Sequence, residues 1–554
     1  MNKKRLPKST YPNRYEIELD VDLDNFSYTG AQKVDLNVVE ATNNIVLNSV
    51  GIEVTKAKIQ TTKQDIPLEV NYIEEDEKIV FESQETLSEG VYELYLEFNS
   101  EITNDLKGFY KSSYMSEDGE KKWIATTQFE PTAARSAFPC WDEPEYKAIF
   151  SMTIITDEKY LRVSNEMVVE EEKVENNKLR TKFADSMKMS SYLVAFVIGD
   201  LEATVVGKSK TTDIRIIHRP GFSHQTSYAG TAAIKLLDFF EDYYKIPYPG
   251  TKLDLIAIPD FAMGAMENVG AVTFRENLLL FDKDKATRSE LDRSITVIAH
   301  ELAHMWFGDL VTMKWWDGIW LNEAFASLME VIASYNTYPE FKQWNAMNMS
   351  RTAGFSIDSL ENSRPVEFDV ETPDQAEEMF DVLTYEKGST VLRMFQMFIG
   401  EEAFQNGVEA YLNKFKFENT NSSDLWDALS EASNQPLNKI LPFWIREKGY
   451  PFLQVDCSNN FLTIKQKPFL LKNVETDKNN IKPVPVQIKF LDTGNEEKFL
   501  LDEAERVIDL RNLGEVPHIN SGGWGFFHTF YDDEVFENIL CLLYTSDAAD
   551  ERSS

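Results

Sequence analysis

The stretch HELAHMWFGDLVTMKWWDGIWLNEAFA, residues 300–326, decides how this chain is interpreted. It contains two of the six histidines, His300 and His304, four positions apart. On a helix, that spacing makes both imidazoles project from one face. The surrounding sequence LDRSITVIAHELAHMWF predicts such a helix, because Ile295 and Leu302 fall on a separate apolar stripe.

The same stretch contains the groups that a zinc site needs. Two imidazoles and a carboxylate suit Zn²⁺ and leave one position for water. Glu323 follows His304 after an 18-residue spacer, on a second helical pattern, and is the expected third ligand. Glu301 is adjacent to His300 and is placed to take a proton from the water, whose pKa zinc lowers toward ~7. The pattern predicts hydrolysis of an amide, and both exopeptidase and endopeptidase activity remain open.

Composition excludes other classes of function. The chain has 554 residues, 43% of them hydrophobic, so several folded domains are expected. Its formal net charge of −36 argues against nucleic-acid partners and anionic membrane surfaces. No apolar run approaches the ~20 residues that span a bilayer, and no secretory signal is recognisable at the start. Three widely spaced cysteines fit a reducing compartment, so a cytoplasmic location is expected.

Along the chain, the type of hydrophobic periodicity changes twice. The first 200 or so residues alternate with period two, as in YEIELDVDL and YELYLEF, which predicts strands. Helical spacing begins around Gly221 and dominates to about residue 446. Short strand patterns, such as VPVQIKFL, then return. We therefore expect a multidomain α+β protein with a β-domain, a mostly helical domain that holds the histidines, and a small β-sandwich.

Three further stretches carry polar residues without an obvious structural role. TTQFEPTAARSAFPCWDEP contains Glu130, and FDVLTYEKGSTVLRMF has Tyr385 near a helix start. PDFAMGAMENVGAVTFRE presents Glu267 among small residues that let a ligand approach the backbone closely. Each alone would be interpreted as an ordinary surface or core position.

Together these stretches resemble the zinc aminopeptidase family of aminopeptidase N and its relatives. The resemblance rests on HExxH with its distant glutamate, GAMEN, TQFEPTAAR and TYEKG, and it extends through PFWIREKGYP to about residue 540. It implies an enzyme of peptide catabolism that removes the N-terminal residue from peptides with a free N-terminus. It also implies one Zn²⁺ per chain, held by His300, His304 and Glu323, with Glu301 as general base.

The resemblance further implies which residues bind substrate. Glu130 and Glu267 would bind the α-ammonium, and Tyr385 would stabilise the oxyanion of the tetrahedral intermediate. Fixing an ammonium one residue from the scissile carbonyl restricts attack to the first peptide bond, and two carboxylates are suitable partners for it. Gln128 matches a position that lines the pocket for the first side chain. The remaining substrate contacts are expected from the GAMEN loop: Gly264, Ala265, Met266 and Asn268.

Alternatives remain at this point. A zinc endopeptidase is disfavoured by Glu130 and Glu267, and a bifunctional relative of the leukotriene-hydrolase kind by the strands after Gly449. A catalytically impaired peptide-binding fragment is a third possibility. Two positions depart from the family pattern: Asp309 stands where relatives usually have asparagine, and Ala324 where glycine usually follows the glutamate ligand.

The resemblance also suggests domain limits. We expect a saddle-like N-terminal β-domain over residues 1–203, a thermolysin-like catalytic domain over 204–447 and a β-sandwich over 448–530. Relatives of this layout usually continue into a large helical domain, of which residues 531–540 would be the start. The last stretch, CLLYTSDAADERSS at 541–554, resembles an in-frame translation of a transposon-type sequencing adaptor, so we expect a non-native tail on a truncated chain.

Overall fold

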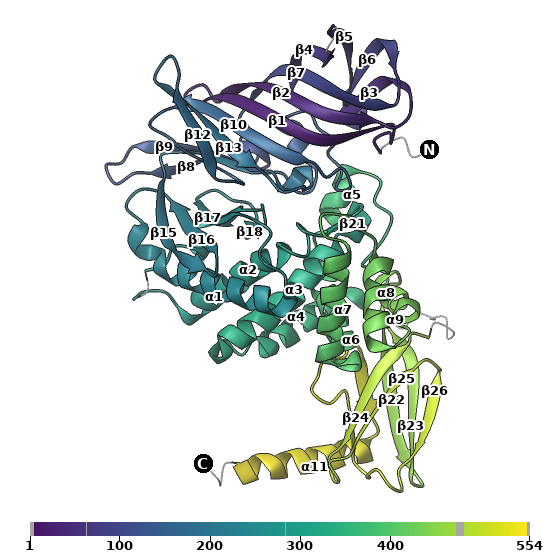
Figure 1. Cartoon of the computed structure of the whole chain (residues 1–554). Coiled ribbons are helices and arrows are strands. Elements are labelled where there is room, and N and C mark those ends of the chain that lie inside the picture. Colours follow the sequence, from purple (N-terminus) through teal and green to yellow (C-terminus); the bar gives the residue numbers. More distant parts are fainter. Residues whose placement is uncertain (1–4, 62–63, 283, 472–480, 551–554) are drawn as a thin grey trace.

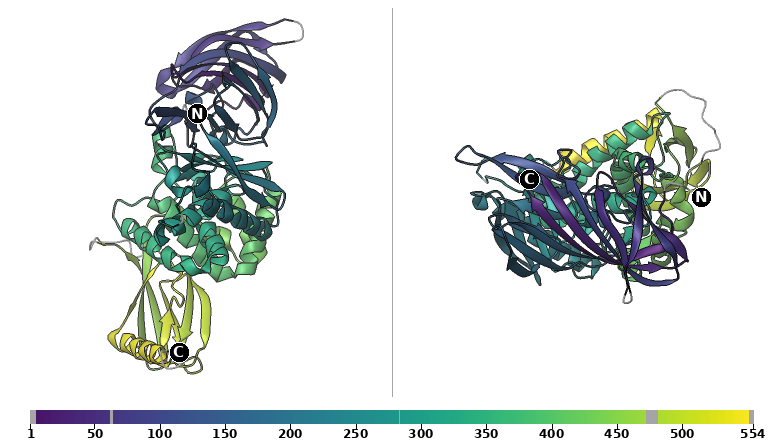
Figure 2. Two further views of the ribbon diagram at one scale, coloured as in Figure 1. Left: turned by 90° about the vertical axis from the view of Figure 1, so that its left-hand side faces the viewer. Right: turned by 90° about the horizontal axis from the view of Figure 1, so that it is seen from above.

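The computed structural model describes residues 5–61, 64–282, 284–471 and 481–550. Figure 1 shows a β-rich region at one end, a helical region in the middle and a smaller β-region at the other end. The left view of Figure 2 shows the same elongated arrangement from another side, and the right view looks at the molecule from above. The expected fold class is thus confirmed, whereas the expected domain limits stay predictions.

The N-terminal region is built on a sheet with the strand order β12-β13-β10-β1-β2-β7-β4-β5-β6-β3. Alternation creates its buried face: in β1, Tyr15, Ile17 and Leu19 are at most 1% exposed, and the residues between them face outward. The strands of this sheet are β1 (Thr10–Asp22), β2 (Ser27–Val38), β3 (Thr42–Asn48), β4 (Glu53–Gln60), β5 (Ile66–Ile73), β6 (Lys78–Leu87), β7 (Gly90–Glu101), β10 (Ile149–Asp157), β12 (Val168–Lys173) and β13 (Lys178–Asp185).

A second sheet of this region carries a loop toward the middle of the molecule. Its order is β11-β14-β9-β8, formed by β8 (Gly108–Met115), β9 (Lys121–Gln128), β11 (Leu161–Ser164) and β14 (Phe196–Gly199). Gln128 ends β9, and Glu130 follows two residues later. Both predicted substrate-binding residues are therefore at the end of a strand that is anchored in the β-domain.

The middle region contains a sheet that the sequence pattern did not reveal. Its order is β15-β16-β17-β19-β18, formed by β15 (Glu202–Ser209), β16 (Thr212–His218), β17 (Lys252–Ile258), β18 (Ala265–Met266) and β19 (Ala271–Arg275). Every residue of β17 is buried, so its sequence KLDLIAI lacks the alternation that identifies a half-exposed strand. β18 lies within the GAMEN stretch and pairs with β19, so the sheet holds that stretch at its edge.

Helices make up most of the rest of the middle region, as expected. They are α1 (Ser227–Tyr244), α2 (Arg288–His304), α3 (Trp320–Thr337), α4 (Gln343–Asp358), α5 (Pro373–Glu378), α6 (Gly388–Ile399), α7 (Glu401–Lys414), α8 (Ser422–Ser433), α9 (Leu437–Ile440) and α10 (Pro442–Ile445). A π-helical turn, η8 (Leu383–Lys387), directly precedes α6. Trp306, Trp316 and Trp320 are at most 1% exposed, so the segment that contains the two predicted metal-binding helices is embedded in the core.

The C-terminal region forms two sheets, β26-β23-β22-β28 and β25-β24-β27. Their strands are β22 (Tyr450–Ser458), β23 (Phe461–Phe469), β24 (Val484–Phe490), β25 (Glu496–Leu501), β26 (Glu505–Asp509), β27 (Pro517–Ile519) and β28 (His528–Tyr531). The final helix, α11 (Asp533–Asp550), is continuous across Cys541, where the foreign tail was expected to begin. Residues 551–554 of that expected tail lie outside the described residues.

Among the helices in the described ranges, none is both long enough and apolar enough to cross a membrane.

Candidate active site

The two histidines of the opening stretch lie at the end of α2. Thr287 and Glu290 form a capping box that fixes where this helix begins. Thirteen positions after the cap, His300 faces the same side as His304, and their ring centroids are 4.7 Å apart. The helical spacing of the two imidazoles that the sequence predicted is therefore confirmed.

Glu323, in the first turn of α3, meets both histidines. Its Oε2 lies 3.2 Å from Nε2 of His300 and 3.4 Å from Nε2 of His304. One possible ligand atom from each of the three side chains lies within 4.8 Å of the other two. Two imidazoles and one carboxylate that converge in this way fit a zinc ion with an open position.

The outward-facing ring nitrogens are also occupied. Nδ1 of His300 lies 2.9 Å from Oε2 of Glu330, and Nδ1 of His304 lies 2.9 Å from the carbonyl oxygen of Phe307. These contacts orient both rings with Nε2 toward Glu323, as second contacts of metal-binding histidines commonly do. Sequence reasoning missed Glu330, although it follows Glu323 by seven positions on one helical pattern and so shares its face.

The carboxylates of this cluster favour a positive charge between them. Burial alone would lower the pKa of His300, but its hydrogen bonds to Glu323 and Glu330 raise that pKa to about 9. Burial opposes ionisation of Glu323, yet the charges and hydrogen bonds of His304 and His300 hold its pKa well below the usual range. A divalent cation would receive the same stabilisation once the ring protons have left.

Glu301, the predicted general base, is 5% exposed. Burial raises its pKa to about 8, and the negative charge of Glu267 acts in the same direction, while His300 opposes it. A carboxylate with a pKa near neutrality suits proton transfer at physiological pH.

Glu130 and Glu267 come together although they belong to different parts of the chain. One carboxylate oxygen of each lies within a 4.8 Å group that also includes Glu323. Within the described ranges, Oε1 of Glu130 and Oε1 of Glu267 are buried and have no hydrogen-bond partner. Burial, and then the charge of Glu267, raises the pKa of Glu130 well above its ordinary value, and burial also raises the pKa of Glu267. Two such oxygens are suited to a cationic ligand that brings its own hydrogen-bond donors.

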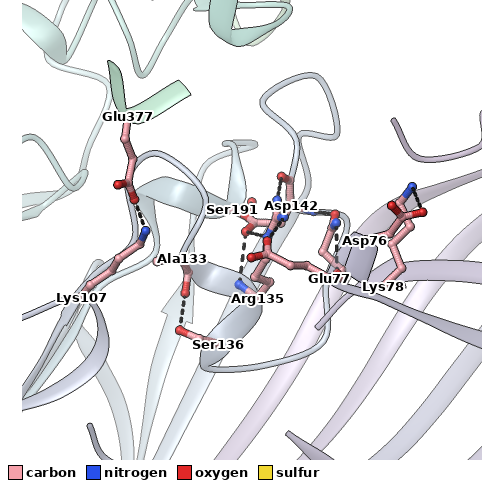
Figure 3. A network of polar contacts seen from close by, with 11 residues as sticks. Asp76, Glu77, Lys78, Lys107, Ala133, Arg135, Ser136, Asp142, Ser191 and Glu377 are labelled. Atoms are coloured by element: carbon pink, nitrogen blue, oxygen red, sulfur yellow. Dashed lines mark hydrogen bonds and ion pairs between the residues drawn. The ribbon is translucent and has the colours of Figure 1, made fainter. Parts of the chain in front are cut away.

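The loop that carries Glu130 is held by a buried ion pair (Figure 3). Arg135 donates from Nε to Asp142 at 2.9 Å and from a terminal nitrogen to Glu77 at 2.8 Å. Ser191 donates to the other oxygen of Asp142 at 2.7 Å. Arg135 and Asp142 are 5% and 2% exposed. The network therefore holds the loop through contacts in the protein interior and not at the surface.

The predicted GAMEN contacts are divided between the cavity and the core. Gly264, Ala265 and Met266 line the same cavity as the histidines, and Gln128 donates to the Met266 sulfur at 3.4 Å. Asn268 is not among the lining residues: it is 1% exposed and its amide donates to Thr273. Its substrate-binding role stays a prediction, and in this structure its side chain supports the turn.

Tyr385 lies in η8 and also lines the cavity. Its ring centroid is 6.0 Å from that of His300, with the two ring planes 22° apart. Gly388 allows this close arrangement, because a Cβ there would lie 2.6 Å from Cβ of Ala324, the neighbour of Glu323. The methyl group of Ala324, where relatives usually have glycine, is therefore accommodated because residue 388 is itself a glycine.

The cavity has a volume of about 620 Å³ and contains, besides the residues above, Arg293, Glu377 and Glu386. A larger cavity of about 1070 Å³ lies between the β-domain and α5 and shares Asp105 and Lys107 with it. Figure 3 shows the ion pair of Lys107 and Glu377 that bridges the two regions there. The larger cavity contains none of the predicted metal or substrate residues, so chemistry rather than size identifies the site.

Known proteins resemble this chain over most of its length. The Peptidase M1 N-terminal domain matches residues 11–193, and the Peptidase family M1 domain matches residues 228–444. Aminopeptidase M1 of Arabidopsis thaliana is 40% identical over 96% of this chain and 62% of its own length. Aminopeptidase M1-A of Oryza sativa subsp. japonica is 38% identical over 96% of this chain and 61% of its own length. Puromycin-sensitive aminopeptidase of Caenorhabditis elegans is 37% identical over 97% and 58%.

The chain therefore spans about three fifths of the length of these relatives. The two matched domain types follow one another in the order of the β-rich and helical regions described above. With its HExxH helix, its distant glutamate and its GAMEN edge strand in one cavity, the chain belongs to peptidase family M1.

Proposed function

We propose that this protein is a zinc aminopeptidase that removes the N-terminal residue from peptides with a free N-terminus. The observation that carries the proposal is the position of two buried carboxylates, each with one oxygen that accepts no hydrogen bond from the described residues, beside the three possible metal ligands. A hydrolytic centre alone would act on any accessible amide. The adjacent anionic site selects amides that have an ammonium one residue away.

His300, His304 and Glu323 would hold one Zn²⁺, and their donor set and convergence fit that ion. When bound, the ion supplies Lewis-acid chemistry: it makes water more acidic and polarises a carbonyl. Glu330 and the Phe307 carbonyl hold the two imidazoles in the orientation that this requires.

Glu130 and Glu267 orient the substrate. Each offers the α-ammonium a buried oxygen that accepts no other hydrogen bond within the described part of the chain. These oxygens would replace the water that the substrate amine loses on entry. This contact sets which peptide bond faces Glu301. The GAMEN backbone along the cavity edge would align the main chain, and Gln128 with Met266 would border the first side chain.

Glu301 would take a proton from the attacking water and return it to the leaving amine. Burial raises the pKa of its carboxyl group, so its carboxylate is a stronger base than that of an exposed glutamate. Tyr385 would donate its hydroxyl proton in a hydrogen bond to the oxyanion as the carbonyl becomes tetrahedral. Burial raises the pKa of Tyr385 well above its ordinary value, so the hydroxyl stays protonated and can donate.

The cytoplasm remains the proposed location. It is supported by three cysteines that form no disulfide among the described residues.

A peptide digest tests the proposed function. The zinc-loaded protein should shorten a decapeptide one residue at a time from its N-terminus, as followed by mass spectrometry. The Glu301→Gln variant, which keeps the shape of the side chain, should leave the peptide intact. Internal cleavage, or equal digestion by Glu301→Gln, would contradict the proposal.

A further inference from the structure

A lysine close to Tyr385 in the chain forms a fully buried ion pair with an aspartate. Nζ of Lys387 lies 2.8 Å from Oδ2 of Asp358, and the side chains of both residues are 0% exposed. Lys387 is the last residue of η8, two positions after Tyr385. Asp358 is the last residue of α4. The pair lies outside the wall of the active-site cavity, so it has no direct part in the chemistry proposed above.

The other polar atoms of this pair attach it to the start of the C-terminal sandwich. Oδ1 of Asp358 accepts from the backbone N–H of Gly449 at 2.8 Å and from the Ser363 hydroxyl at 2.8 Å. Nζ of Lys387 also donates to the carbonyl oxygen of Glu447 at 3.4 Å. The segment that carries Tyr385 is thus tied to the chain just before β22.

Lys482 reaches the same junction from the sandwich side. It is 4% exposed and donates to the carbonyl oxygen of Phe443 at 2.5 Å. Burial lowers the pKa of Lys482 to about 8, and the nearby positive charge of Lys387 acts in the same direction. Two buried ammonium groups therefore share one junction: Glu447 pairs with Lys482 at 3.3 Å, and Asp358 is the fully buried carboxylate that pairs with Lys387.

The turn that carries Tyr385 is fixed at its other end as well. Oδ1 of Asp381 accepts from the backbone N–H groups of Leu383 at 2.9 Å and Thr384 at 3.1 Å, and Arg364 pairs with Asp381 at 2.6 Å. Contacts at both ends leave little freedom to a five-residue π-helical turn, a form that is rare and is often found at functional sites.

Stability alone does not account for the Lys387–Asp358 pair. Removing two charges from water costs free energy that their attraction offsets only in part, and a well-packed apolar pair is often as stable or more so. What an apolar pair would lack is the directional contact to the backbone of Gly449 and Glu447.

We propose that Lys387 is a positioning residue: through Asp358 it fixes the π-helical turn and so places the Tyr385 hydroxyl where the oxyanion develops. This inference rests on the proposed aminopeptidase activity and deepens it. The contact should matter for the transition state and not for binding of the substrate in its ground state.

A double-mutant cycle in the full, zinc-loaded chain tests the inference. Lys387→Met, Tyr385→Phe and the double variant are compared on one fluorogenic aminoacyl amide, with separate kcat and KM values. Loss of one oxyanion donor costs about 10²- to 10³-fold in kcat, so displacing it through Lys387→Met should lower kcat about tenfold or more. KM should stay within about twofold, and affinity for a tetrahedral phosphinic dipeptide analogue should fall in parallel with kcat.

In the Tyr385→Phe background, Lys387→Met should have no further effect on kcat, because the hydroxyl that it positions is already gone. Lys58→Met is the control: Lys58 pairs with Asp65 in the β-domain, outside the active-site cavity, and its loss should leave kcat unchanged in both backgrounds. If Lys387→Met does not fold, Asp358→Asn enters the same cycle with the same expectation.

The outcomes separate this inference from the proposed function. If Tyr385→Phe loses kcat but the Lys387→Met loss is fully additive to it, or appears in KM alone, the positioning role is overturned and the aminopeptidase stands. If the unaltered chain does not cleave the amide, or Tyr385→Phe retains full kcat, the proposed function itself is overturned in whole or in the role of Tyr385.

Discussion

His300 and Glu330 form a contact of 2.9 Å between Nδ1 and Oε2, directly behind the nitrogen that faces Glu323. The two residues belong to α2 and α3, so the contact joins the helices that supply all three possible metal ligands. It keeps the imidazole from rotating and makes the nitrogen that faces Glu323 a more basic metal ligand. The geometry of the site therefore depends on a carboxylate that is not itself a predicted ligand.

Glu330→Ala should weaken zinc binding about 10- to 100-fold, because the His300 ring loses its orienting partner. Competition against a fluorescent zinc chelator measures the change. Glu377→Ala is the control, since Glu377 lines the same cavity but pairs with Lys107 and not with a histidine. Equal zinc affinity of Glu330→Ala and the unaltered chain would show that the contact has no such role.

Glu267→Ala should lower kcat/KM on substrates with a free amino terminus by about 10²-fold or more, because it leaves the ammonium with an incomplete, buried partner set. The carboxylate is 3% exposed, so water cannot readily take its place. Steady-state kinetics on aminoacyl amides measure the loss. Full activity of this variant would remove the basis for assigning the pair of carboxylates to the ammonium.

Asp309→Asn should stabilise the fold by about 1 kcal/mol or more, since it removes a buried carboxyl group whose oxygens accept no hydrogen bond from any described residue. Asp309 is 0% exposed, and neither of its oxygens accepts a hydrogen bond within the described ranges. Burial, with the charge of Glu267, raises its pKa well above the ordinary value. Denaturant unfolding at neutral pH provides the free energy of unfolding.

The matched control is Asp142→Asn. Asp142 is buried to a similar degree, but its oxygens accept from Arg135 and Ser191. Breaking such a pair costs about 3–5 kcal/mol, so this variant should be less stable than the unaltered chain. Destabilisation by both substitutions would contradict the assignment of Asp309 as a buried carboxyl group that lowers the stability of the fold.

Removal of metal should lower the melting temperature. A ligand that binds only the folded state stabilises it by about 2.7 kcal/mol at a concentration 100 times its Kd. Differential scanning fluorimetry with and without a chelator measures the shift, and added Zn²⁺ should restore it. His304→Ala should reduce the chelator effect strongly, and an undiminished shift in that variant would place the metal elsewhere.

Much of the site was predictable from local spacing. The four-residue interval between the histidines and the second helical pattern around Glu323 both follow from the period of an α-helix, and the structure contains both helices. The approach of Glu130 to Glu267 is not a local property. It depends on the packing of the β-domain against the middle region, and only the family resemblance linked these two residues.

Other features left no readable pattern in the sequence. β17 is buried on both faces, so its apolar run lacks strand alternation. The π-helical turn at Tyr385 is contacted by residues distant in sequence, such as Asp358, and a short window of sequence does not reveal such contacts. Glu330 is different, because its spacing from Glu323 was visible and could have been used.

The most direct test of the central claim compares two amides that differ only at the amino terminus. The purified, zinc-loaded chain is given alanyl aminomethylcoumarin amide and its N-acetyl form, and kcat/KM is measured for each. The arrangement of Glu130 and Glu267 predicts cleavage of the free amine and a loss of about 10²-fold or more on acetylation, since the buried carboxylates then face a neutral group. Equal cleavage of both amides would contradict an aminopeptidase and would leave only an unselective hydrolytic centre.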